Sequence, residues 1–371
     1  MVTYLLNWFR LVAAFCLLSP LLCFAEQATP NSAGDQAPFF ISFQAPGSTG
    51  TFPQSINDLM VVTGYYETKW GDRGIADERG FVRYPDGSII TFAVPGAMAT
   101  RPVSINHAGD VTGYYLVPYP PTTIPQYHSS VPQGFVRTAD GTITTFGNTP
   151  NGVGTGVWLE PAAINDAGEA AGTENDGLGQ IIFTRSASGD IEKFSFGFDS
   201  NDQISAAGLN ASGAILGYTN PDVPERLVHQ GFLWSGNGTT TPIIAFGSTW
   251  TIPLAINAGG TIAACYLSKA GLLNFVRDPD GTFTTLYIPG EREALTNITI
   301  NDAGTIMGYY PSTPTVDAGF IKRRGRDVIT FAYPGASYFT PAGLNNLDVV
   351  TGYYRLLFKG PTEGFIYVPG N

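Results

Sequence analysis

Few side chains in this chain have the types and spacing that catalysis requires. Its 371 residues include three histidines, His107, His128 and His229, which are far apart in the sequence. The sequence has no Gly-x-Ser-x-Gly nucleophile motif, phosphate-binding loop or His-rich metal spacing. It therefore favours binding over catalysis, and we expect neither a cofactor nor a metal. The alternative is a lyase or hydrolase of a polysaccharide or lactone, which would use His128, His229, Glu160 and Glu225.

Aromatic and histidine side chains in or beside long connections are the candidates for a binding surface. Such connections occur in only a few copies of the repeat that builds the chain. Exposed aromatic side chains cost a fold little to replace and can carry much of a binding energy. The candidates are Trp70, Tyr119, Tyr127, His128, Trp158, His229 and Trp250.

Two recurring motifs also carry polar chemistry. A turn such as residues 165–168, Asn-Asp-Ala-Gly, could suggest a calcium loop, but calcium needs several converging oxygen ligands. An Asn that caps a hairpin is the favoured interpretation. Tyrosine pairs such as Tyr65 and Tyr66 could line a sugar-binding wall. Because adjacent strand residues face opposite sides, one of each pair must pack between sheets, and the periodic recurrence favours packing.

Basic residues recur at the end of the third strand of the repeat, for example Arg83 and Arg137. A ring of such groups could bind an acidic glycan. However, Phe81 lies two residues before Arg83 on the same face of the strand. The favoured interpretation is therefore structural: the arginine stem covers an aromatic ring, and its head pairs with a nearby carboxylate such as Asp86 or Asp140.

One phrase of sequence recurs seven times, and this recurrence decides the fold class. It contains a hydrophobic-Asn pair, a Gly-containing turn, a strand that often ends in Gly-Tyr-Tyr, then Gly-Phe, Asp-Gly-Thr and Thr-Phe. The marker asparagines are 44 to 59 residues apart, and a four-stranded propeller blade typically takes about 40–50 residues. The markers are Asn57, Asn106, Asn165, Asn210, Asn257, Asn301 and Asn345.

The second copy shows how four short strands fit one repeat. Residues 102–106 and 110–115 are its first two predicted strands, and residues 134–137 and 142–146 are the third and fourth. The Asp-Gly between the last two is a strong hairpin signal. No segment after the first 25 residues has a helical period. The sequence therefore predicts an all-β fold of four-stranded antiparallel blades.

The two ends of the chain look like complementary parts of one copy. The seventh copy has predicted strands at 342–345, 349–354 and 364–367 but lacks a fourth, whereas residues 39–43 have the pattern of a fourth strand. We therefore expect the N-terminal strand to complete the last blade and close a seven-bladed β-propeller. A solenoid is the alternative, but it needs distinct capping repeats.

Long and short connections should separate onto two faces of such a propeller. The turns after the marker asparagines are short, whereas the links at 67–79, 116–133 and 219–230 and the connection at 147–161 are longer and variable. Repeat proteins usually bind through their variable face. We therefore expect a non-catalytic binding or scaffold protein, a monomer, whose partner is a glycan, a peptide or an envelope component.

The first 25 residues have the features of a secretion signal. Arg10 precedes an apolar run at 11–24, which is too short for a membrane span of about 20 residues. We expect residues 26–38 to be an unstructured lead-in and residues 39–371 to form the propeller, secreted or periplasmic, with no transmembrane segment left. Loss of Arg10 changes the net charge from −11 to −12, which disfavours nucleic acid as a partner.

Cysteine usage excludes a disulfide framework. Cys16 and Cys23 lie in the signal, so the mature chain keeps only Cys265. In its copy, Cys265 stands where a tyrosine usually stands, which predicts a packing role. A lipid anchor on Cys23 is the alternative to simple cleavage, but its neighbours fit that processing poorly.

The repeat resembles that of bacterial extracellular proteins of the HAF-repeat type. Their units carry an Ile-Asn-x-x-Gly-x-x-x-Gly core followed by a Phe-containing strand, and residues 105–113 and 134–135 match this pattern. The match covers about residues 39–371. The resemblance implies export and a repeat fold, and it implies no activity or site residue. Departures from the pattern occur at Leu59, Leu347 and Ala264.

Overall fold

The computed structural model describes most of the chain after residue 36. The described residues are 37–70, 76–118, 130–147, 158–175, 177, 179–195, 202–221, 229–288, 295, 297–311, 317–358 and 360–370. Pro38–Pro369 forms one compact unit that contains every strand. The second unit joins Met1–Ala37 to Gly370–Asn371; the predicted signal and nearly all of the predicted lead-in lie there, outside the described residues. No helix in the described part could cross a membrane.

The second to ninth strands of the chain form an eight-stranded sheet that consists of two four-stranded antiparallel units. A single parallel pair, Glu78 with Ala99, joins the two units. The strands of the first unit are β2 (Gly50–Ile56), β3 (Val62–Trp70), β4 (Ala76–Arg83) and β5 (Ile89–Phe92). Those of the second unit are β6 (Ala99–Ile105), β7 (Val111–Pro118), β8 (Ser130–Arg137) and β9 (Ile143–Phe146).

Five further sheets have four antiparallel strands each. The first two contain β10 (Trp158–Ile164), β11 (Ala170–Asn175), β12 (Gln180–Arg185) and β13 (Ile191–Phe194), then β14 (Asp202–Leu209), β15 (Ile215–Pro221), β16 (Gly231–Trp234) and β17 (Thr240–Ile243). The next two contain β18 (Thr251–Ile256), β19 (Ile262–Ser268), β20 (Gly271–Arg277) and β21 (Phe283–Leu286), then β22 (Ile298–Ile300), β23 (Ile306–Pro311), β24 (Asp317–Lys322) and β25 (Val328–Phe331). The last contains β26 (Tyr338–Leu344), β27 (Val350–Arg355), β28 (Glu363–Val368) and β1 (Phe39–Phe43). The predicted all-β class is confirmed, and the strands of the second copy lie where the sequence predicts them.

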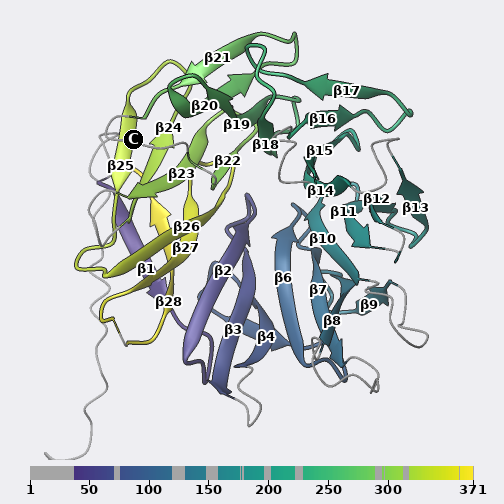
Figure 1. Ribbon diagram of the computed structural model, residues 1–371. Coiled ribbons are helices and arrows are strands. Elements are labelled where there is room, and N and C mark those ends of the chain that lie inside the picture. Colours follow the sequence, from purple (N-terminus) through teal and green to yellow (C-terminus); the bar gives the residue numbers. More distant parts are fainter. Residues whose placement is uncertain are drawn as a thin grey trace, which may run out of the picture. The chain divides into compact units, whose positions relative to one another are not determined.

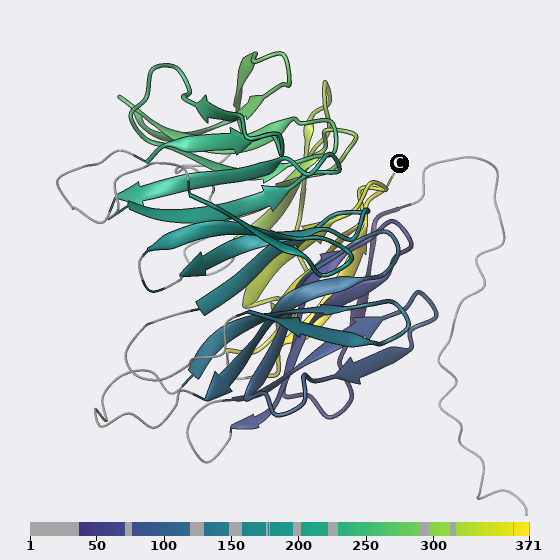
Figure 2. The same cartoon turned by 90° about the vertical axis from the view of Figure 1, so that its right-hand side faces the viewer.

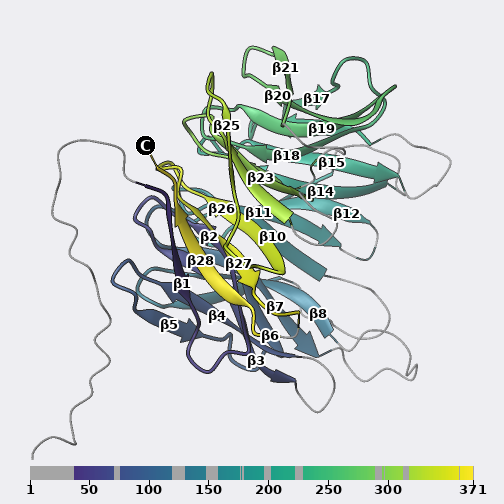
Figure 3. The same ribbon diagram turned by 90° about the vertical axis from the view of Figure 1, so that its left-hand side faces the viewer.

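Strand β1 joins the two ends of the compact unit. It pairs antiparallel with β28, with Phe39 opposite Val368 and Phe43 opposite Gly364, and Figure 3 shows the two strands side by side. Phe40 anchors β1, because its ring lies 4.8 Å from the ring of Tyr367. This is the pairing that the sequence predicts for residues 39–43. Each sheet is open, and none closes on itself.

The sheets follow one another in chain order around a common centre (Figure 1) and pack face to face (Figure 2). Each third strand places one phenylalanine in the core between sheets. The buried cluster that contains Phe81 also joins the last sheet to the first, through Ile366 and Val62. Full burial of one large ring per third strand explains the periodic Phe of the repeat. These rings, at most 1% exposed, are Phe81, Phe135, Phe183, Phe232, Phe275, Phe320 and Phe365.

A bulge in the first strand explains the glycine of the Gly-Tyr-Tyr motif. The pairing of β2 with β3 shifts register between Pro53 and Ser55. The first strand then comes so close that a Cβ on Gly64 would lie 2.2 Å from the carbonyl oxygen of Phe52, so only glycine fits. Gly113 is as close to its own first strand.

The recurring arginines have the predicted structural role with a different partner. The guanidinium of Arg83 lies 5.0 Å from the ring centroid of Phe43, in the neighbouring sheet. Arg137 lies in the same way over Phe92. No salt bridge joins the described side chains of Arg83 and Asp86, but their charges still interact: burial lowers the pKa of Arg83, and this shift is opposed by the charge of Asp86. The carboxylate of Asp86 accepts the N–H two residues on, at 2.9 Å, within its own turn.

Candidate functional site

Each marker asparagine directly follows the first strand of a four-stranded unit (β2, β6, β10, β14, β18, β22 or β26). We call these residues the asparagine cap, and they link neighbouring units. Oδ1 of Asn301 accepts the N–H of Thr305 at 2.9 Å within its own turn, and Nδ2 donates to the carbonyl of Asn345 in the next sheet at 3.0 Å. Asn345 donates in turn to the carbonyl of Asn57 at 3.1 Å, from the last sheet to the first. The predicted hairpin cap is confirmed, and the bond between sheets was not predicted. The donors of such bonds are Asn57, Asn106, Asn165, Asn257, Asn301 and Asn345.

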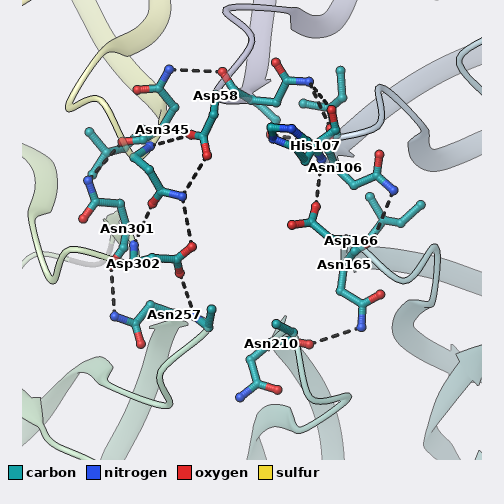
Figure 4. A pocket seen from close by; sticks show the side chains of 18 of the residues that line it. Asp58, Asn106, His107, Asn165, Asp166, Asn210, Asn257, Asn301, Asp302 and Asn345 are labelled. Atoms are coloured by element: carbon teal, nitrogen blue, oxygen red, sulfur yellow. Dashed lines mark hydrogen bonds between the residues drawn. The ribbon is translucent and has the colours of Figure 1, made fainter.

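The residue after each marker completes this end of the sheets. The carboxylate of Asp302 accepts the N–H of Ala258 at 2.8 Å, and Nδ2 of Asn346 donates to both Asp302 and Asp58 at 2.9 Å. These groups surround a cavity of about 250 Å³ (Figure 4). Within the described residues no group of three acidic, histidine or cysteine side chains could hold a metal ion. Most polar groups of this end therefore serve hydrogen bonds within the protein.

Half-buried aromatic residues gather toward the other ends of the first strands. In β3, Tyr65 pairs with Phe52 of the first strand, whereas the next residue, Tyr66, is 4% exposed and lies in the core. In β27, Tyr353 and Tyr354 divide in the same way. The packing hypothesis is thus confirmed for one member of each of these two pairs, Tyr66 and Tyr354. We call this region the tyrosine end; it comprises Phe52, Tyr65, Arg101, Tyr114, Tyr309, Tyr338 and Tyr353.

Ring and cation–π contacts join this set, apart from Tyr309, into one row across three sheet units. Phe52 stacks on Tyr65 with centroids 4.9 Å apart, and it meets Tyr353 edge-on at 5.2 Å. Tyr338 lies 6.1 Å from Tyr353. On the other side, the guanidinium of Arg101 lies 5.2 Å from the ring centroid of Tyr65. The row therefore passes without a break from the last sheet over the first unit to the second.

The positive charge within the row is balanced. Arg101 forms a two-pronged ion pair with the buried carboxylate of Glu78, with one N···O distance of 2.6 Å, and it donates to the hydroxyl of Tyr114 at 3.0 Å. These hydrogen bonds raise the pKa of Arg101 despite its burial. A second carboxylate, Glu67, is close by; burial and the charge of Glu78 raise its pKa. The row therefore carries no excess positive charge.

A cavity of about 360 Å³ opens beside the row, between the innermost strands of four sheet units. Polar groups on its wall include the amides of Gln54 and Asn297 and the hydroxyl of Thr340. Nδ2 of Asn297 donates to the hydroxyl of Tyr309 at 2.7 Å. Thr340 is 6% exposed, and its hydroxyl has no hydrogen-bond partner in the described structure. The apolar part of the wall comes from Leu254, Ile298, Met307, Pro341 and Ala342.

The hydroxyls of Tyr65, Tyr309 and Tyr353 stay protonated at neutral pH, because burial raises their pKa. Burial raises the pKa of Tyr65 to about 12, although the Arg101 guanidinium opposes the shift. Burial also raises the pKa of Tyr353, and the neighbouring phenols of Tyr338 and Tyr309 add to the effect. The site thus presents neutral hydroxyl and amide groups, each able to donate and to accept a hydrogen bond.

Of the residues predicted from sequence, the structure brings two together. The rings of His229 and Trp250 lie 5.0 Å apart, and the backbone N–H of Thr251 donates to the carbonyl of His229. Burial lowers the pKa of His229. Trp158 begins β10, half-buried, and no hydrogen bond or ring contact in the described part joins it to either residue. Tyr119, Tyr127 and His128 lie outside the described residues, and only the backbone of Trp70 is described, in β3.

The described part of the structure does not bring together the residues that the lyase or hydrolase alternative would use. His128 and Glu225 lie outside the described residues. Between Glu160 and His229, both described, there is no hydrogen bond or ion pair. Cys265 is fully buried, and burial raises the pKa of its thiol to about 11, which confirms its predicted packing role and opposes thiolate chemistry.

Comparison with known proteins gives the fold. No family model and no curated protein matches the chain. A catalytically inactive virginiamycin B lyase from Staphylococcus aureus, solved with quinupristin, aligns over 89% of this chain and 99% of its own, with a TM-score of 0.52 and 14% identity. The β-propeller domain of the Trilobed protease from Pyrococcus furiosus aligns over 88% and 94%, with a TM-score of 0.60 and 9% identity. An acylaminoacyl peptidase from Pyrococcus horikoshii aligns over 87% of this chain and 52% of its own, with a TM-score of 0.60 and 10% identity. At such low identities the likeness shows the fold alone, and the chain has an all-β, propeller-like fold.

Proposed function

We propose that this chain is an exported, non-catalytic binding protein and that it binds through its tyrosine end. One contrast carries the proposal. At the tyrosine end, neutral phenol and amide groups border a cavity, and the buried hydroxyl of Thr340 in its wall has no partner in the described structure, whereas the polar groups of the asparagine cap bond mostly within the protein. Lyases and peptidases are among the proteins of similar fold, so the fold does not itself select binding over catalysis.

A paired screen tests this function. The purified chain would be presented to immobilised polysaccharides and peptides, and the same polymers would be assayed for cleavage products. We expect binding without product formation. Tyr338→Ala, at the tyrosine end, should weaken binding, while Tyr287→Ala, an equally drastic change at an exposed tyrosine outside it, should not. Product formation would favour the lyase or hydrolase alternative, and equal behaviour of the two variants would place the binding surface elsewhere.

The proposed architecture is a closed seven-bladed β-propeller at residues 39–371, with strand β1 as its closing strand. It is supported by the pairing of β1 with β28 and by the hydrogen bond from Asn345 to Asn57. Deletion of residues 26–47 should therefore lower the thermal midpoint sharply, whereas deletion of residues 26–36 alone should change it little. A midpoint that stays the same within error in the longer deletion would contradict closure by this strand.

The proposed location is outside the cytoplasm, as the HAF-repeat resemblance and the signal-like residues 1–25 imply. The chain would act there as a monomer with residues 26–38 as a lead-in. N-terminal sequencing of the protein recovered from the medium or periplasm should start at Glu26. Recovery from the cytoplasm alone, with residues 1–25 retained, would contradict export.

A further inference from the structure

We propose that the tyrosine end binds an uncharged oligosaccharide, whose terminal unit enters the cavity lined by Gln54, Asn297 and Thr340. This inference rests on the proposed function and adds the chemical class of the ligand. The cavity, at about 360 Å³, lies at the low end of the range of about 300–1,000 Å³ for small-molecule sites, as suits one sugar ring. The row of aromatic residues beside it would contact the following units.

The hydrogen-bonding groups of the cavity suit a polyhydroxylated ligand. Each sugar hydroxyl donates one hydrogen bond and accepts others, so a matching wall needs neutral groups that can also do both. The amides of Gln54 and Asn297 and the hydroxyls of Thr340 and Tyr309 have this property. The Thr340 hydroxyl lacks a partner in the described structure, and a buried polar group without a partner costs free energy unless a ligand or water satisfies it.

The charges of the site disfavour an anionic ligand. Two guanidinium groups belong to the row: Arg101 is paired with the carboxylate of Glu78, and Arg355 donates to Thr362 and acts through its charge on Glu67. Glu67 adds a further carboxyl group near the same side chains, since the charge of Glu78 acts on it. A uronic acid or a phosphorylated sugar would meet guanidinium groups whose charges Glu78 and Glu67 already offset, and it would lose its hydration without full compensation.

The same row disfavours a cationic ligand. Cations bind aromatic clusters by lying over ring faces, but guanidinium groups already occupy such positions in this row. Arg101 lies over Tyr65 and Tyr114, and Arg355 lies 5.9 Å from the ring centroid of Tyr338. An amino sugar would therefore be repelled at both ends of the row. An uncharged sugar fits, because its C–H groups can contact the apolar wall near Leu254 while its hydroxyls reach the polar groups.

The test compares three ligand classes on wild-type protein and matched variants. Uncharged gluco-, manno- and galacto-oligosaccharides of two to six units, uronic-acid oligosaccharides and amino-sugar oligosaccharides would be titrated calorimetrically into the full mature chain. We expect binding in the uncharged class alone. Thr340→Val should weaken it roughly tenfold, the effect of losing one good hydrogen bond, while Thr330→Val, on the exposed part of β25, should have no effect.

The stability of the same variants separates a binding role from a structural one. Thr340→Val removes a hydroxyl that has no partner, so its thermal midpoint should be unchanged or higher. Tyr309→Phe should also weaken binding, and Tyr287→Phe should not. Binding confined to an acidic, amino-sugar or peptide ligand that is still weakened by Thr340→Val and Tyr309→Phe would overturn the ligand class and leave the proposed function standing. Binding that neither variant weakens would overturn the site itself.

Discussion

The asparagine cap and the tyrosine end lie at opposite ends of the first strand of each unit, and they differ in how constant their residues are from one copy of the repeat to the next. At the asparagine cap all seven copies contribute the same residue, and six of the seven donate the same bond to the next sheet. At the tyrosine end the copies differ, since the position of Tyr65 and Tyr353 is Thr173 in the third copy and Cys265 in the fifth. Positions that the repeat holds constant build the scaffold, and positions where copies differ are free to build a site.

Replacement of a core phenylalanine should give the largest effect. Phe135 is fully buried, so Phe135→Ala should lower the free energy of unfolding by about 3–5 kcal/mol. Urea denaturation would measure this loss, with Thr144→Ala on the exposed part of β9 as the control. If the two changes cost the same, the periodic Phe would not be the scaffold element that the repeat implies.

Removal of a cap asparagine should cost less, and two copies allow its turn bonds and its inter-sheet bond to be separated. Asn345→Ala removes the turn bonds from Leu347 and Val349 and the bond to Asn57, a loss of about 2–3 kcal/mol. Asn210 accepts the equivalent turn bonds from Ser212 and Ala214, and one from the Ser212 hydroxyl, but donates no bond to the next sheet among the described residues. Asn210→Ala should therefore cost about 1 kcal/mol less than Asn345→Ala. Equal losses would mean that the bonds between sheets contribute nothing.

The fold was predictable from sequence where it depends on local pattern. The Asp-Gly turns, the strands of each copy and the match between residues 39–43 and the incomplete last copy are all read along the chain. The inter-sheet bond of Asn301 was not predictable, because it depends on the distance between two copies in space. For the same reason the sequence placed one tyrosine of each pair in the core but could not tell that other members, such as Tyr65 and Tyr353, both contact Phe52.

A smaller effect with a defined pH dependence is expected at Glu67. Burial and the Glu78 carboxylate raise its pKa in the folded protein, so the folded state binds its proton more tightly than the unfolded chain does. The stability contribution of Glu67 therefore falls as the pH rises from the ordinary glutamate pKa through the raised one. Glu67→Gln should remove this fall.

Urea denaturation at several pH values would check this prediction. Glu67→Gln should gain stability relative to wild type near neutral pH and lose that gain below the ordinary glutamate pKa. Glu192→Gln, the same change at an exposed position of β13, is the control. A gain that does not depend on pH would contradict the assigned cause.

The difference between the two ends is tested most directly on a single strand. Gln54 lines the cavity at the tyrosine end, and Asn57, three residues later, belongs to the asparagine cap. Urea denaturation of Gln54→Ala and Asn57→Ala would be measured side by side. We expect a change within about 0.5 kcal/mol for Gln54→Ala and a loss of about 2 kcal/mol or more for Asn57→Ala. A loss at Gln54 as large as that at Asn57 would contradict the division into a scaffold end and a binding end.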